Sequence, residues 1–109
     1  MISRKILGSS NPSATTETDI YTVPAGKEAL AAVFITNLST SAGATIRVAV
    51  GSNGAGSIAN SDYIAYEVQL DPRMVIKLHP IALDTGDIIT VYASTANVTF
   101  KATGLEIDS

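Results

Sequence analysis

The triplet Asp84-Thr85-Gly86 is the sequence in this chain that comes nearest to a catalytic motif, because Asp-Thr-Gly can present one carboxylate of a proton-sharing pair. Such chemistry needs two of these carboxylates on a loop that the substrate can reach. Here a further carboxylate, Asp87, follows the triplet directly, which is an unsuitable neighbour for a shared proton. We therefore interpret the segment as a turn, with a positive φ at the glycine and aspartates that bind local backbone amides.

Other residue types that could do chemistry are isolated. Gly51-Ser-Asn-Gly-Ala-Gly56 resembles a phosphate-binding loop, but neither Lys-Ser/Thr nor a helix pattern follows it. His79 is the sole histidine, there is no cysteine, and the six aspartates lie in separate turns without the spacing of a calcium loop. We therefore expect no catalytic residue, no cofactor and no metal, and we predict that the protein is not an enzyme.

Tyrosines are the remaining candidates for recognition. Tyr63 and Tyr66 flank the start of one predicted strand, and Tyr92 lies in another. Exposed tyrosines suit stacking on sugar rings or contact with a protein. With six aromatic residues in the whole chain, a structural role in covering the core is the stronger interpretation.

Composition limits both the fold and the partners. A chain of 109 residues has room for one domain, and its 46% hydrophobic content exceeds what a disordered chain contains. The net charge of −3 and the pI near 4.8 argue against nucleic acid and against an anionic membrane as partners. No apolar run approaches the ~20 residues of a membrane span, and no signal peptide is visible, so we expect synthesis in a cytoplasm.

The elements that must position these residues are predicted to be strands. Ile, Val and Thr together make up 32 of the 109 residues, and Ile46, Val48 and Val50 alternate with other residues at a period of two. Turn signals such as Val23-Pro-Ala-Gly26, which matches a type I turn, separate the segments. After Gly104 the apolar positions change phase to Leu105 and Ile107, which predicts a β-bulge. Strands are expected near residues 3–7, 18–23, 28–37, 44–50, 63–69, 74–79, 88–93 and 97–107.

This pattern predicts an all-β fold, a single antiparallel β-sandwich of about eight strands that resembles a jelly roll. Residues 8–18 are almost wholly Ser, Thr, Asn, Pro and Ala, and apolar residues precede them. We expect residues 1–18 to form an N-terminal strand and an extended arm, and residues 19–109 to form the sandwich. The N-terminal strand belongs either to a neighbour's sheet or to the chain's own. Candidate interface residues are Ile2, Arg4, Lys5, Ile6, Leu7, Pro12, Tyr63 and Tyr66.

An ordered series of short motifs covers the chain from residue 7 to residue 107. It comprises Leu7-Gly8-(x)3-Pro12, Tyr21-Thr-Val-Pro-Ala-Gly26, Ile35-Thr-Asn37, Arg47-Val-Ala-Val50, Tyr63-Ile-Ala-Tyr66, Thr85-Gly-Asp87, Val91-Tyr-Ala-Ser94, Val98-x-Phe100 and Gly104-Leu-Glu106. In this series the chain resembles small virion structural proteins of tailed bacteriophages. The resemblance implies a β-sandwich that decorates or cements a phage particle, usually as an oligomer, and it transfers no catalytic residue.

The resulting functional expectation is a head decoration or cement protein. Its partners would be the major capsid protein or other virion proteins and further copies of itself, and its location would be the capsid exterior. Two alternatives stay open, namely a tail, fibre or baseplate component of the same fold, and a carbohydrate-binding module.

Overall fold

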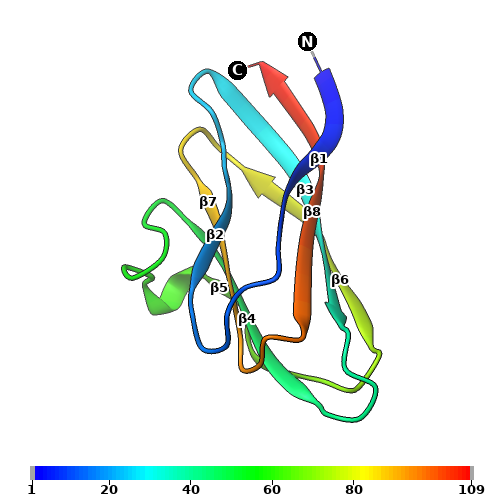
Figure 1. Cartoon of the computed structure of the whole chain (residues 1–109). Helices are drawn as coiled ribbons and strands as arrows, with labels where there is room; N and C mark the ends of the chain where they lie inside the picture. Colours follow the sequence, from blue (N-terminus) through cyan, green and yellow to red (C-terminus); the bar gives the residue numbers. More distant parts are fainter. Residues whose placement is uncertain (1, 109) are drawn as a thin grey trace.

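Eight strands form two sheets within residues 2–108, the part of the chain that this computed structural model describes (Figure 1). The first sheet has the order β1-β8-β3-β6, the second sheet has the order β2-β7-β4-β5, and all paired strands are antiparallel. A short 3-10 helix, η1 (Asn60–Asp62), precedes the fifth strand. The strands are β1 (Ile2–Ser10), β2 (Thr18–Thr22), β3 (Lys27–Asn37), β4 (Ala44–Gly51), β5 (Tyr63–Leu70), β6 (Val75–Leu83), β7 (Ile88–Ala93) and β8 (Val98–Asp108).

The predicted eight-stranded antiparallel β-sandwich is confirmed. Each strand of the first half of the chain pairs with its counterpart in the second half: β1 with β8, β2 with β7, β3 with β6, and β4 with β5. The chain therefore has the connectivity of one long hairpin folded over into two layers. The more specific resemblance to a jelly roll stays a prediction. The start of β1 and the end of β8 consequently lie side by side at one end of the molecule (Figure 1).

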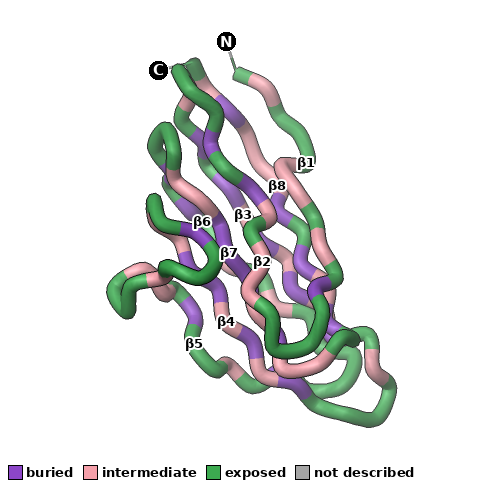
Figure 2. Tube along the Cα trace, turned by 60° about the vertical axis from the view of Figure 1, so that its left-hand side comes forward, coloured by how far each residue is buried: buried purple, intermediate pink, exposed green. Residues whose placement is uncertain are grey.

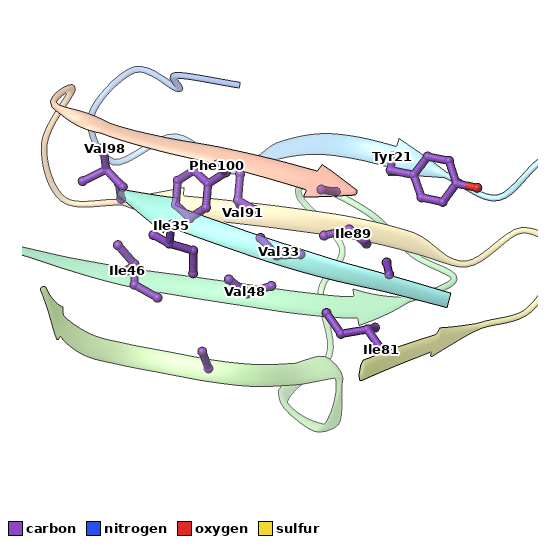
Figure 3. Packing of buried hydrophobic residues seen from close by; sticks show 14 of the residues in the cluster. Tyr21, Val33, Ile35, Ile46, Val48, Ile81, Ile89, Val91, Val98 and Phe100 are labelled. Carbon is purple, nitrogen blue, oxygen red and sulfur yellow. The ribbon is translucent and has the colours of Figure 1, made fainter. Parts of the chain in front are cut away.

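The core lies between the two layers and follows the alternation in the sequence. In β3 the buried residues are every second one from Ala29 to Asn37, so the intervening residues point outward (Figure 2). Figure 3 shows the inward side chains of both sheets in contact, with Phe100 and Ile35 from the first sheet above Ile46 and Val48 from the second. Burial of these side chains from both layers provides the main free energy of folding.

The predicted change of phase at Gly104 is wrong. Inward positions of β8 continue without a shift through Ala102 to Glu106, and the pairing of β8 with β3 is regular along its length. The bulge lies instead in β1, where the register shifts between Ile6 and Gly8. Gly104 is needed for a different reason, since a Cβ there would overlap the carbonyl oxygen of Leu30 on the adjacent strand.

Two turns were predicted from their residues. At residues 84–87 the prediction holds: Asp84 Oδ1 accepts from the amide of Thr85, Asp87 Oδ2 accepts from the amide of Asp84, and Gly86 has φ of 85°. The turn after β2 is shifted by one residue from the type I frame. Its hydrogen bond runs from the Lys27 amide to the Pro24 carbonyl, which places Gly26, with φ of 77°, inside the turn.

The N-terminal segment lies against the chain's own sandwich. β1 pairs with β8 from Ile2 to Ser10, so the chain's own sheet holds the first strand. Beyond it, Asn11 Nδ2 donates to the carbonyls of Ala96 and Val98, and the amide of Thr15 donates to the carbonyl of Ala93. The division into residues 1–18 and residues 19–109 stays a prediction, as does an exchange of this segment between copies.

Candidate functional site

The outer surface of the first sheet is rich in apolar side chains. Ile2, Ile6, Leu30 and Val75 are 58%, 60%, 42% and 60% exposed. They are joined there by half-buried outward residues of β3 and β8, namely Phe34, Leu105 and Ile107. We call these seven residues the apolar face. Isolated exposed apolar residues are ordinary, but a contiguous group on one sheet face is typical of an interaction site.

The strand register fixes how these side chains lie side by side. Leu30 of β3 pairs with Leu105 of β8, and Leu105 pairs with Arg4 of β1, so the three side chains form one row across the sheet. The next row toward the chain end places Ile2 opposite Ile107. The apolar face is therefore continuous from the edge strand β1 to the middle of the sheet.

Charged side chains flank the centre of this face on both sides, and Val75 lies one row beyond the basic residues. At one end Glu28 pairs with Ile107 in register, and the turn with Asp84 and Asp87 follows β6 close by. At the other end Lys77 and Lys101 flank Phe34 in one row, and the Lys77 ammonium lies 5.4 Å from the Phe34 ring centroid. Within residues 2–108, neither Glu28 nor Lys101 has an ion-pair partner.

The inner side of β1 carries an ionic contact as well as the apolar side chain of Leu7. The carboxylate of Glu106 is buried, and it accepts hydrogen bonds from the Tyr21 hydroxyl at 2.6 Å and from the Lys5 ammonium at 2.7 Å. These two donors, Lys5 foremost, hold the pKa of Glu106 below its ordinary value. Because Tyr21 lies on β2, this contact joins the two sheets where their edge strands β1 and β2 meet. Burial and the neighbouring carboxylate raise the pKa of Tyr21.

The outer surface of the second sheet carries a different group. The Arg47 guanidinium lies 4.7 Å from the ring centroid of Tyr66 and 4.3 Å from that of Tyr92, and it donates two hydrogen bonds to the Glu67 carboxylate. Tyr63 meets Tyr66 edge to face, with 4.9 Å between ring centroids. These five residues form the tyrosine cluster. The bonds from Arg47 hold the pKa of Glu67 below its ordinary value.

A β-bulge assembles the tyrosine cluster. The pairing of β4 with β5 shifts between Ile46 and Val48, so Tyr66 and Glu67 together face Arg47. Glu67 takes φ of 51° there, an uncommon conformation for a side chain of its size. Beside the cluster, Asn60, Tyr63 and Tyr66 line a surface hollow of about 470 Å³.

The glycine-rich loop after β4 binds the chain's own carboxylates. The amide of Ala55 donates to Asp19 Oδ1 at 2.8 Å, and the amide of Gly56 donates to Glu17 Oε1 at 2.8 Å. These amides are the groups that a phosphate would need, and they are already engaged within the chain. The loop is therefore fastened to the segment that leads into β2 rather than open for an anion.

Other chemistry-bearing residues stay apart in the structure. His79 is exposed on β6, at the rim of a hollow that Asp62 also lines. In the described part of the chain, no three residues among His, Asp and Glu lie close enough together to hold a metal ion. Among the same residues, no helix has the length and the apolar character required to span a lipid bilayer.

The predicted interface residues thus fall into four groups. Ile2, Arg4 and Ile6 point outward on the first sheet, whereas Lys5 turns inward to Glu106. Leu7 packs against the core and Pro12 is buried, so within the single chain neither presents a surface to a partner. Tyr63 and Tyr66 lie on the second sheet. No sequence pattern signals the placement of Arg47 between two rings, because that contact depends on three strands.

Comparisons with known proteins add little to this picture. No family model matches the chain, and no curated protein sequence matches it. Two crystal structures of a pentameric capsid protein isolated from metagenomic phage sequences are similar to it, each with 15% identity over 95% of this chain and with TM-scores of 0.38 and 0.37. The chain spans about three fifths of the length of those capsid proteins. At this identity and these TM-scores, the likeness carries no argument about function.

Proposed function

We propose that this chain is a non-enzymatic structural protein of a tailed-phage particle, located on the outside of the head, where it binds and stabilises the shell of the major capsid protein. The observation that carries the proposal is the apolar face. Ile2, Ile6, Leu30 and Val75 expose apolar surface on one side of a small domain, and contact with a partner protein would remove that surface from water.

The motif series that resembles virion proteins also supports the proposal. In the structure most of its elements are strand ends and turns, whereas residues 47–50 and 104–106 lie within β4 and β8. The segment from Tyr21 to Gly26, for example, is the end of β2 with the turn into β3, and the segment from Thr85 to Asp87 is the turn before β7. A virion protein needs such a compact frame more than it needs reactive groups.

The mechanism would be mechanical. A particle presents many copies of each binding surface, so contacts that are weak for a single copy add up over the shell. The charged residues at the two ends of the apolar face would fix the orientation of each copy, because charge placement sets specificity more than it sets affinity.

The proposal is tested by antibody-gold labelling of intact particles of the phage that encodes this chain, imaged by electron microscopy. Label spread over the head is the expected result. Label confined to the tail would overturn the head location and favour a tail, fibre or baseplate component. Particles that contain none of the protein on a blot would overturn a virion role altogether. Particles from a phage with the gene deleted serve as the control.

A second candidate function is carbohydrate binding, favoured by the hollow that Asn60, Tyr63 and Tyr66 line. Tyrosine rings stack on sugar rings, and the Asn60 amide would supply directional hydrogen bonds. A glycan array with the purified protein tests it, with Tyr66→Ala as the variant. Tyr92→Ala is the matched control, since Tyr92 belongs to the cluster but does not line the hollow. No signal from the wild type, or signal that survives Tyr66→Ala, would dismiss this function.

A further inference from the structure

We propose that two copies of this chain associate through their apolar faces, as a two-fold dimer in which the strands of one face run antiparallel to those of the other. The first sheets of the two copies would form the inner layers of a four-layer stack. This inference concerns the isolated protein. The dimer would cover the same surface that the proposed function assigns to the contact with the capsid partner, so the two contacts would compete.

The centre of the face is suited to contact with an identical surface. Leu30 and Leu105 lie side by side in the middle of the sheet, with the small outward residues Ala32 and Ala82 next to them on β3 and β6. Pro80 and His79 border a shallow hollow of about 270 Å³ beside Leu30 and Leu105. Leucines beside a hollow give two identical faces both the projections and the recess that close packing requires.

The two ends of the face have opposite charge. Glu28 lies at the end next to the Asp84–Asp87 turn, whereas Lys77 and Lys101 lie in the row of Phe34. Phe34 lies six positions after Glu28 on β3, which is about 20 Å along an extended strand. The face therefore runs from an acidic end through an apolar centre, with Arg4 at its β1 edge, to a basic end.

This polarity selects one two-fold arrangement. If the axis runs across the strands, the acidic end of each copy lies over the basic end of the other, and two equivalent attractive contacts form. If the axis runs along the strands, the lysines of one copy lie over the lysines of the other, and the acidic residues likewise meet. Like charges brought together across an interface cost free energy, so the antiparallel arrangement is favoured.

The outer surface of the first sheet is large enough for a reversible dimer when the apolar face and the charged rows that flank it are counted together. Four strands of about nine residues cover roughly 19 Å by 30 Å, or on the order of 600 Å² per copy. Two faces would together bury on the order of 1,200 Å², slightly above the roughly 1,000 Å² that marks a specific interface. We therefore expect a dimer that dissociates on dilution rather than a permanent one.

Sedimentation equilibrium of the full chain tests the inference, over a concentration series that reaches several hundred micromolar. Leu30→Asp should raise the dissociation constant of the dimer at least 100-fold, because it places a carboxylate at the centre of the face. Leu38→Asp is the matched control. Leu38 is 57% exposed but lies in the loop after β3, outside the apolar face, and its variant should dimerise like the wild type. Circular dichroism checks that both variants are folded.

A charge-swap experiment tests the antiparallel arrangement itself. The double variant Lys77→Glu, Lys101→Glu has acidic residues at both ends, and the single variant Glu28→Lys has lysines at both ends. Each should dimerise at least 10-fold more weakly than the wild type, and an equimolar mixture should recover a one-to-one heterodimer.

Three results would overturn the proposal. One is a wild type that stays monomeric throughout the series; if Leu30→Asp then still prevents binding to phage particles, the face belongs to another protein. Another is a wild-type dimer that Leu30→Asp leaves intact, which would place the interface elsewhere. The last is a pair of charge variants whose mixture associates no better than either alone, which would exclude the antiparallel contact.

Discussion

The outer faces of the two sheets meet the same solvent, yet contacts within the chain engage their side chains to very different extents. On the second sheet, Arg47 lies between two tyrosine rings and donates two hydrogen bonds to Glu67. On the first sheet, Ile2, Ile6 and Val75 are each more than half exposed, and Phe34, Leu105 and Ile107 are only half-buried.

This difference separates two uses of surface. The tyrosine cluster makes its contacts within one chain, so it contributes to the stability of the monomer. The apolar face gains free energy only when a second molecule covers it, so it contributes to association and little to folding. Substitutions in the tyrosine cluster should therefore change the stability of the monomer, and substitutions on the apolar face should change its association.

The largest expected effect contrasts the two sides of a single strand. Phe100 is 1% exposed between the sheets, and Phe100→Ala should lower the free energy of unfolding by about 3–5 kcal/mol, because it removes a large side chain and leaves a cavity. Its neighbour Lys101 points outward, and Lys101→Ala should change stability by less than about 0.5 kcal/mol. Urea unfolding followed by circular dichroism measures both. Similar losses at the two positions would show that the alternation in β8 is misassigned.

This alternation is also what made most of the fold predictable. β-branched residues at a period of two, separated by turns of Pro, Gly, Asn and Asp, are local signals, and all eight strands were located from them. Apolar alternation does not predict the inward position of Glu106, because this pattern marks only apolar residues as inward. A carboxylate continues the inner side of β8, and its donors Lys5 and Tyr21 lie 101 and 85 residues away in the sequence. No local pattern reports such a contact.

The candidate site was predicted less well, for a related reason. Ile2 and Ile6 are interface candidates from the sequence because they are apolar residues ahead of a polar segment, and that role stays a prediction. The tyrosine cluster depends instead on irregular geometry: the register shifts twice along β5, and Glu67 takes φ of 51°. Strict alternation places residues three apart on opposite sides of a strand, so it does not bring Tyr63 against Tyr66.

A smaller effect is expected where the first sheet meets the second, at the edge strand β1. Lys5→Met removes one donor from the buried carboxylate of Glu106 and should lower stability by about 1–2 kcal/mol at pH 7. The expected loss is below that of a fully buried ion pair, because half of the Lys5 side chain is exposed to solvent. Arg4→Met is the matched control, since Arg4 neighbours Lys5 but points outward.

The pH dependence of this loss identifies its cause. The pKa of Glu106 is lower in the folded chain than its ordinary value of 4.5, so its contribution is present above that value and is lost as the pH falls through the lowered pKa. Without Lys5 the pKa of Glu106 should rise. The difference in stability between wild type and Lys5→Met should therefore be largest near pH 7 and should shrink toward pH 3. A difference that is constant over this range would assign the effect to packing instead.

On the second sheet, Arg47→Ala should lower stability by about 1 kcal/mol, because the guanidinium loses its stacking between two rings. The same substitution should leave the dimer dissociation constant within about twofold of the wild type, since Arg47 lies on the opposite side of the sandwich from the apolar face. Thermal unfolding and sedimentation equilibrium measure the two quantities. A weakened dimer with unchanged stability would reverse the roles assigned to the two faces.

The smallest effect is expected at Val75, and it tests the comparison most directly. Val75→Thr exchanges a methyl group for a hydroxyl of similar size on a side chain that is 60% exposed, so the stability of the monomer should change by less than about 0.5 kcal/mol. The same exchange at Val48, which is fully buried, should cost about 1–3 kcal/mol because the hydroxyl is taken out of water. Urea unfolding at protein concentrations well below the dimer dissociation constant isolates the monomer. A loss at Val75 comparable to that at Val48 would mean that the chain itself already packs the outer side of the first sheet, and the apolar face would then need no partner.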